Sequence, residues 1–205
     1  KKPAKELLYA LFLVEAKLTR RDTLSVIELA KEFSFSKIRK RGIQKAINLG
    51  LVIQEETEFD SFWNKILIPN LAERHNAKPV HSLEEITQLK KDFPINIRQF
   101  NVYYQGEIVA GTTIFETDIV AHCQYISKFE KGENLGSLDF LYDYLIRKKF
   151  AKKQFFDFGV SNENLGKKLN EGLSYWKESF GASTVVHDFY EVDTIHYSKL
   201  ENVLI

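Results

Sequence analysis

The stretch from 97 to 158 constrains the fold most, because its apolar pattern fixes both the kinds of element and their order. Strand-like alternation with tight turns predicts a three-stranded antiparallel meander over 97–104, 107–115 and 119–126. A helical stripe over 138–146 follows, and then a short apolar strand over 155–158, of the kind found inside a sheet. The connection between 126 and 155 is long enough for a crossover that returns the last strand parallel to the third.

The remaining segments read as helices and short strands. Apolar spacing predicts helices over 4–17, 37–49, 59–67 and 164–179, and a capping box at Ser82 and Glu85 begins another. Short strands are expected over 22–29, 51–53 and 184–190. Pro69 is expected to kink or end the helix that precedes it.

Composition excludes several classes of protein. The 205 residues carry 29 basic and 28 acidic side chains, so net charge gives no general attraction to nucleic acid or an anionic membrane. A single cysteine, Cys123, excludes an intrachain disulfide framework and a cysteine-rich zinc site, and it favours a cytoplasmic location. The apolar run over 7–14 is too short to span a bilayer.

The loop over 127–136 is the first candidate for a binding site. It leads into a helix N-terminus, where free N–H groups and the positive end of the helix dipole favour a phosphate group. Gly132 and Gly136 would let the backbone approach a ligand closely. Glycines in this position are also ordinary turn and cap residues, so both interpretations stay open.

The order of meander, glycine-containing loop, helix and parallel return strand resembles that of GNAT acyltransferases. The residues 156–161, Gly166 and 170–182 are similar to the closing signature of Fem-like proteins, and 37–46 ahead of Gly50 is similar to an earlier part of them. The segment 75–82 is similar to a subgroup associated with bacterial surface-polymer loci. The resemblance covers residues 36 to 190.

This resemblance implies an α/β (α+β) fold with a GNAT-like, mixed, mostly antiparallel twisted sheet flanked by helices. It also implies a pair of GNAT-like lobes. The chain begins Lys1-Lys2-Pro3 and contains no methionine, so we expect a fragment of a longer polypeptide. On this basis residues 1–35 are expected to be a remnant or linker from an absent N-terminal lobe, and 36–205 the C-terminal Fem-like domain.

The resemblance further implies an N-acyltransferase that moves an acyl or aminoacyl group to an amine of a small molecule, sugar or peptide, in surface-polymer biosynthesis. Acyl-CoA, as acetyl-CoA, is the expected co-substrate, and aminoacyl-tRNA is possible but not favoured because the chain has no long coiled-coil insertion. The residues expected to bind the donor are Ser127, Lys128, Gly132, Asn134, Gly136 and Ser137. Two other readings remain open: a non-catalytic lobe that recognises a glycan or peptide precursor, and a nucleic-acid-binding protein.

Three residues are candidates for catalysis. Asp157 lies on a short apolar strand, where an acid needs a partner or a function, and it could orient or deprotonate an amine. Tyr125 and Tyr190 could protonate a leaving group, although each could equally be a tyrosine at the edge of the core. Cys123 is expected to be a small core residue, since no nearby histidine supports a covalent mechanism.

Other polar residues are candidates for acceptor binding. They are His75, His81, His122, Gln124, Ser161 and Lys177. His75 and His81 lack a third ligand at metal-binding spacing, so no metal site is expected. His122 and Gln124 alternate with Cys123 and should share the opposite face of a strand. A solvated surface lysine is the alternative for Lys177, and the basic face of the helix over 37–49 is the feature that would bind nucleic acid.

Overall fold

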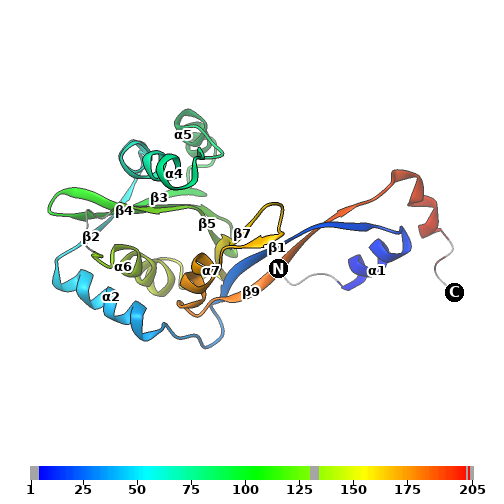
Figure 1. The fold of residues 1–205 in the computed structure, drawn as a ribbon, viewed down its shortest axis with the longest axis horizontal. Helices are drawn as coiled ribbons and strands as arrows, with labels where there is room; N and C mark the ends of the chain where they lie inside the picture. Colours follow the sequence, from blue (N-terminus) through cyan, green and yellow to red (C-terminus); the bar gives the residue numbers. More distant parts are fainter. Residues whose placement is uncertain (1–4, 130–133, 202, 204–205) are drawn as a thin grey trace.

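The computed structural model describes residues 5–129, 134–201 and 203, without the side chains of residues 5, 74 and 75. Seven strands form one mixed sheet in the order β2-β3-β4-β5-β6-β1-β9 (Figure 1). Their bounds are β1 Lys17–Glu28, β2 Val52–Glu56, β3 Ile97–Tyr104, β4 Glu107–Glu116, β5 Val120–Lys128, β6 Phe155–Val160 and β9 Ser183–Glu191. The pairing of β5 with β6 is parallel and the other pairs are antiparallel.

Helices cover both faces of the sheet (Figure 1). One face carries α2 (Lys37–Asn48), α6 (Ser137–Tyr144) with the π-helical η2 (Leu145–Lys149), and α7 (Glu171–Glu178). The other carries α3 (Asp60–Phe62), the π-helical η1 (Trp63–Leu67), α4 (Ile68–His75) and α5 (Leu83–Asp92). Each face has its own apolar core, one around Tyr142 and Phe158 and the other around Trp63 and Tyr125.

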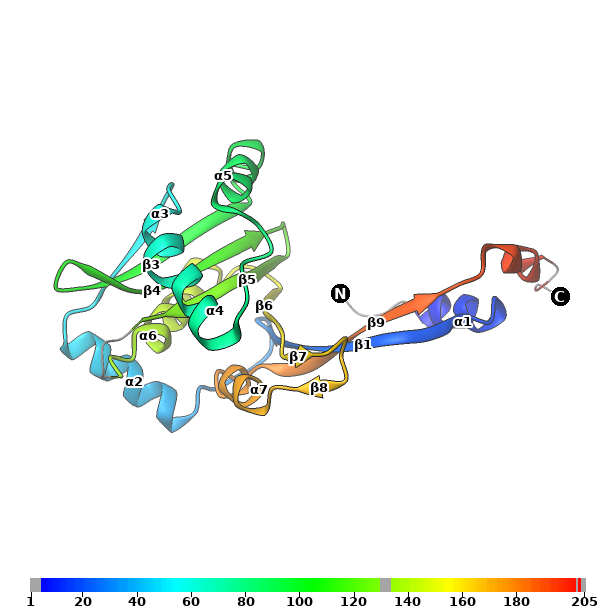
Figure 2. The same ribbon diagram turned by 45° about the horizontal axis from the view of Figure 1, so that its top comes forward.

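A two-stranded ribbon extends away from this body. The outer parts of β1 and β9 pair beyond the sheet and end at α1 (Lys5–Leu13) and the 3-10 helix η3 (Thr194–Leu200) (Figures 1 and 2). Large apolar side chains are exposed there, including Phe12 at 76% and Ile195 at 70%. The inner part of β1 pairs with β6, so this strand belongs to the same sheet as the strands that follow residue 36.

The predicted fold class, meander, crossover and capping box are confirmed. Pro69 does not end the helical segment, because it occupies the first turn of α4, where no backbone N–H is needed, directly after the π-helical turn. The helix predicted over 164–179 was wrong in its first half. A small hairpin of β7 (Asn162–Glu163) and β8 (Lys168–Leu169) replaces it, and α7 begins only at Glu171.

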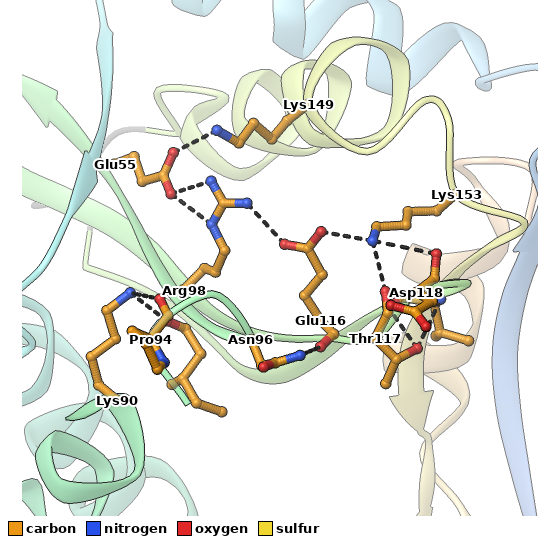
Figure 3. Close-up of polar contacts among 12 residues, drawn as sticks. Glu55, Lys90, Pro94, Asn96, Arg98, Glu116, Thr117, Asp118, Lys149 and Lys153 are labelled. Atoms are coloured by element: carbon orange, nitrogen blue, oxygen red, sulfur yellow. Dashed lines mark hydrogen bonds and ion pairs between the residues drawn. The ribbon is translucent and has the colours of Figure 1, made fainter. Parts of the chain in front are cut away.

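A chain of alternating charges ties η2 and the segment after it to three strands (Figure 3). Arg98 on β3 is bound by Glu55 on β2, and its Nη1 lies 2.8 Å from Glu116 Oε2 on β4. Lys149 Nζ lies 2.6 Å from Glu55, and Lys153 Nζ lies 2.7 Å from Glu116. Burial raises the pKa of both glutamates, but hydrogen bonds from the lysines and Arg98 outweigh it and leave each pKa below its ordinary value of 4.5.

This network predicts a pH dependence of stability. Because the folded-state pKa values of Glu55 and Glu116 are lowered, their contribution is present above pH 4.5 and is lost as the pH falls through the lower folded values. Arg98→Met should cost about 1–3 kcal/mol at neutral pH, between the values for surface and buried pairs, and should flatten the acid dependence. Denaturant unfolding at several pH values measures both effects. Arg41→Met, an exposed arginine, is the control, and equal losses in the two variants would contradict the assignment.

Candidate active site

The parallel strands β5 and β6 pair over only three residues and then diverge. The pairs are Val120 with Phe155, Ala121 with Phe156, and His122 with Asp157. At the last pair His122 Nδ1 lies 2.8 Å from Asp157 Oδ2, and the imidazole is one-third exposed (33%). The point where the strands separate is therefore marked by a histidine held by a carboxylate, the arrangement that fixes a ring tautomer for proton transfer.

A β-bulge next to this pair orients the carboxylate. Phe158 and Gly159 of β6 lie opposite the single residue Ser25 of β1, and Gly159 is in the left-handed region with φ 73°. The Gly159 N–H donates to Asp157 Oδ1 at 2.7 Å. Both carboxylate oxygens are thus engaged, one by the backbone and one by His122, so the imidazole cannot easily swing away from the split.

Lys177 of α7 binds the backbone of β6 just beyond the dyad. Its side chain is 2% exposed, and its ammonium donates to the carbonyl oxygens of Gly159 and Val160 at 3.1 and 2.6 Å. Carbonyls that a neighbouring strand would bind are therefore satisfied by a buried cation. Burial lowers the pKa of Lys177 to about 8, against nearby groups, including Asp157, that raise it. The alternative considered from the sequence, that Lys177 is a solvated surface lysine, is therefore wrong.

We expect Lys177 to titrate apart from the other lysines. Its charged form is disfavoured by folding, so the penalty is present below pH 8 and is relieved as the pH rises from 8 toward the ordinary value of 10.5, with stability rising in that window. Carbon-detected NMR of the lysine side chains should give one midpoint near pH 8 that is absent in Lys177→Met. A single common midpoint near 10.5 would show that Lys177 is solvated.

A second histidine lies on the same face of the sheet. Residue Phe115 of β4 pairs with His122, and the ring centroids of Phe115 and His81 are 6.0 Å apart. His81 lies in the loop between α4 and α5, which passes over β5 in Figure 2. Its Nδ1 is 2.7 Å from the hydroxyl of Tyr125, and its backbone N–H donates to that hydroxyl at 3.1 Å. Tyr125 is 8% exposed, and its hydroxyl is hydrogen-bonded to His81.

A bulge in β5 brings Tyr125 onto this face. Thr113 pairs with Tyr125 and Ile114 with Cys123, so Gln124 is skipped in the pairing. Cys123 packs into the core around Tyr142, whereas Tyr125 packs into the core around Trp63. The alternation expected from the sequence thus breaks at Gln124, and Tyr125 takes the place on the His122 face that was assigned to Gln124. Burial raises the pKa of the Cys123 thiol, which disfavours a thiolate nucleophile.

The expected donor loop is engaged by the rest of the fold where it is described. Ser127 is buried and accepts a hydrogen bond from Asn70 at 2.7 Å, and Asn134 accepts one from the Gly136 N–H at 3.1 Å. Ser137 is fully buried at the start of α6, and Lys128 is the last residue of β5. Gly132 lies outside the described residues.

Two features of the α6 N-terminus do not fit the pyrophosphate of acyl-CoA. A side chain at Gly136 would lie 2.2 Å from the carbonyl oxygen of Gly42, so its glycine is required by the packing of α2 rather than by a ligand. Asp139, in the first turn and 5% exposed, already faces the positive end of the helix and is paired with Arg39 at 2.5 Å. Sequence reasoning missed Asp139, although an acid three residues after a helix start is a recognisable signal.

Of the remaining predicted residues, Tyr190 lies far from the His122–Asp157 pair. Tyr190 pairs with Leu18 on the ribbon, whereas Asp157 pairs with Val26, eight residues and roughly 25 Å further along β1. Ser161 is 2% exposed, and its hydroxyl has no hydrogen-bond partner in the described residues. His75 ends α4, and its side chain lies outside the described part of the structure.

A cavity of about 610 Å³ lies at the far end of β4 and β5 from the dyad. Its lining comes from the β3–β4 hairpin, η1 and both ends of the expected donor loop, and comprises Lys65, Tyr104, Gln105, Glu107, Ile108, Val109, Phe129 and Leu135. Its size is within the range of small-molecule pockets. Within the described residues there is no group of three or more acidic, histidine or cysteine side chains that could hold a metal ion. No described helix is both long and apolar enough to cross a bilayer.

Comparison with known proteins identifies the fold. No family model and no curated protein matches the sequence. FemX has a similar structure, with a TM-score of 0.70 and 10% identity over 96% of this chain and 70% of that one. L-PGS from Bacillus licheniformis has a TM-score of 0.65 and 12% identity, and the match covers 95% of this chain and 68% of that one. The C-terminal domain of a proposed lysylphosphatidylglycerol synthetase from Agrobacterium fabrum has a TM-score of 0.64 and 12% identity, and the match covers 93% of this chain and 65% of that one.

These similarities show that the chain shares its fold with FemX and the L-PGS structures, as the predicted resemblance to Fem-like proteins implied. The chain spans about two thirds of the length of each of these structures. Function cannot be carried across at identities of 10–12% and has to be argued from the site itself.

Proposed function

We propose that this chain transfers an acyl or aminoacyl group from an activated donor to a primary amine, with His122 as the general base. The observation that carries the proposal is the His122–Asp157 hydrogen bond of 2.8 Å at the point where β5 and β6 diverge. If Nδ1 carries the proton that Asp157 accepts, Nε2 is free to accept one from an attacking amine. The fold similarity to FemX and L-PGS is consistent with this class of reaction.

The proposed reaction is a direct transfer. The amine nitrogen attacks the acyl carbon, and its proton passes to His122 Nε2 as the C–N bond forms. The bond from the acyl carbon to the leaving group then breaks, and the protonated imidazole returns the proton to that group. Cys123 is buried with a raised pKa, so no covalent intermediate on this thiol is required.

The buried charge of Lys177 supports the same step. Its ammonium is held at the carbonyls of Gly159 and Val160, directly beyond the dyad on β6. A cation in this dry environment stabilises negative charge that develops on the acyl oxygen within its reach. Lys177 is therefore proposed to stabilise charge on the acyl oxygen, rather than to bind the acceptor from the surface.

The donor and the acceptor are proposed to approach from different sides. The cavity beside Lys65 and Phe129 offers the donor more space than the α6 N-terminus, which Gly42 and Asp139 occupy. The acceptor amine would lie over Phe115, between His81 and His122. One of the similar structures is named for the synthesis of lysylphosphatidylglycerol, a lipid, and a precursor of the cell surface is the acceptor class that we propose here.

A companion lobe remains part of the proposal. The exposed apolar residues of α1 and η3, such as Phe12 and Ile195, lie on the ribbon outside the body, and the similar structures are longer than this chain. Slower hydrogen exchange of α1 and η3 in a longer polypeptide that includes flanking sequence would support this packing.

Substitution of His122 provides the test. Transfer from acetyl-CoA and from aminoacyl-tRNA to amino sugars and lysine-containing peptides would be followed by mass spectrometry. His122→Ala should lower the transfer rate by about 10²–10⁴-fold, the usual contribution of a general base. Asp157→Asn should also lower it, because the neutral amide holds the imidazole less firmly.

His187→Ala is the matched control, because this histidine is exposed on the ribbon and should leave the rate unchanged. Full activity in folded His122→Ala would refute the base assignment. A folded wild-type chain that binds precursors but transfers nothing from either donor would instead favour the non-catalytic lobe.

A further inference from the structure

The hairpin of β7 and β8 carries an apolar and cationic tip that the transfer reaction does not use. Leu165 and Leu169 are 65% and 55% exposed, and Lys167 and Lys168 lie between them and are also exposed. Figures 1 and 2 show the hairpin projecting beside the base of the β1–β9 ribbon. An exposed pair of leucines around two lysines has no role in the two apolar cores.

The backbone of the tip is unusual. Asn164, Leu165 and Gly166 are all in the left-handed region, with φ values of 49°, 53° and 84°. Asparagine and glycine accept this conformation readily, whereas leucine does so at a cost. The leucine at 165 thus opposes the local backbone preference while its side chain faces solvent, which points to a contact outside the described chain.

The rest of the hairpin is held firmly on β1. Asn162 accepts hydrogen bonds from the backbone N–H and the hydroxyl of Thr23, the latter at 2.7 Å, and Ser161 N–H donates to the Thr23 carbonyl at 3.1 Å. A side chain at Gly166 would lie 2.2 Å from the carbonyl oxygen of Arg21, so the turn packs directly on that strand. These contacts present the tip in one orientation.

The hairpin carries two basic side chains and one acidic side chain. Lys168 lies opposite Glu163 in the pairing of β7 and β8, and Glu163 accepts a hydrogen bond from Asn170 at 3.3 Å. Within the part of the chain that the structure describes, no ion pair joins Lys167 or Lys168 to a carboxylate, so both ammonium groups are exposed to solvent. Val160, two residues before the hairpin, adds apolar surface and is 42% exposed.

We propose that this tip docks on the surface of an anionic lipid bilayer. Leucine side chains would enter the interface, while the lysine ammonium groups stay at the level of the acidic headgroups, with their apolar stems along the boundary. Two lysines near such a surface strengthen binding, and the attraction is screened by salt. The combination fits a charged lipid surface better than a neutral protein surface, because both the apolar and the cationic residues are used.

Docking would limit the distance between the dyad and the membrane. Asp157 precedes Leu165, at the tip, by eight residues, which extend over roughly 26 Å at most. If the proposed transferase function is correct, its acceptor amine is then carried by a membrane-anchored molecule. The docking itself does not depend on that function, so the two can fail separately.

Vesicle co-sedimentation tests the docking. The wild-type chain should bind phosphatidylcholine vesicles that contain about one-third phosphatidylglycerol, should bind pure phosphatidylcholine much less, and should be released by high salt. Leu165→Ser with Leu169→Ser, and separately Lys167→Gln with Lys168→Gln, should each weaken binding by about tenfold or more. These side chains are exposed, so both variants should keep the wild-type melting temperature.

Two control variants separate the tip from other exposed residues. Val80→Ser with Lys152→Gln removes an exposed apolar and an exposed basic side chain elsewhere and should bind like the wild type. Leu7→Ser with Phe12→Ser removes apolar surface from α1 and should also bind like the wild type. The proposal is overturned if the wild-type chain does not bind anionic vesicles, if the hairpin variants bind as well as the wild type, or if only the α1 variant loses binding.

Discussion

Two backbone carbonyl groups beside the split between β5 and β6, one buried and one partly buried, impose the constraint on which the site depends. Strands that diverge inside a sheet leave backbone groups without partners, and such groups are costly to bury. The Lys177 ammonium satisfies the carbonyls of Gly159 and Val160 and so allows β6 to leave β5 without exposing its backbone to water. In the proposed transfer, the same cation would stabilise negative charge on the reacting carbonyl.

The dyad follows from this arrangement. The bulge at Gly159 turns the backbone N–H toward Asp157, and the last parallel pair puts His122 opposite that carboxylate. Packing of the loop between α4 and α5 on the face of the sheet that carries His122 adds His81, which is fixed by Tyr125. Strand divergence, a buried cation and a carboxylate-bound imidazole are therefore parts of one local solution rather than separate features.

Local patterns predicted the elements of the fold but not the contacts between them. The meander and crossover could be read because apolar alternation is a property of neighbouring residues. Asp157 and His122 were each singled out, yet their contact, across 35 residues, depends on a parallel register that the sequence does not reveal. The burial of Lys177 was missed because the left-handed turn at Leu165, which delays α7, is invisible to helical spacing. The position of Tyr190 on the ribbon, away from the dyad, was also not predicted, because it depends on the pairing of β9 with the outer part of β1.

The central claim is that Asp157 holds His122 with Nδ1 protonated and Nε2 free to accept a proton. Long-range ¹H–¹⁵N NMR of the imidazole tests this directly, because it distinguishes the protonated from the unprotonated ring nitrogen. The account predicts a neutral His122 ring with the proton on Nδ1, and loss of that preference in Asp157→Asn. A ring protonated on Nε2, or one that exchanges between tautomers and is insensitive to Asp157→Asn, would contradict it.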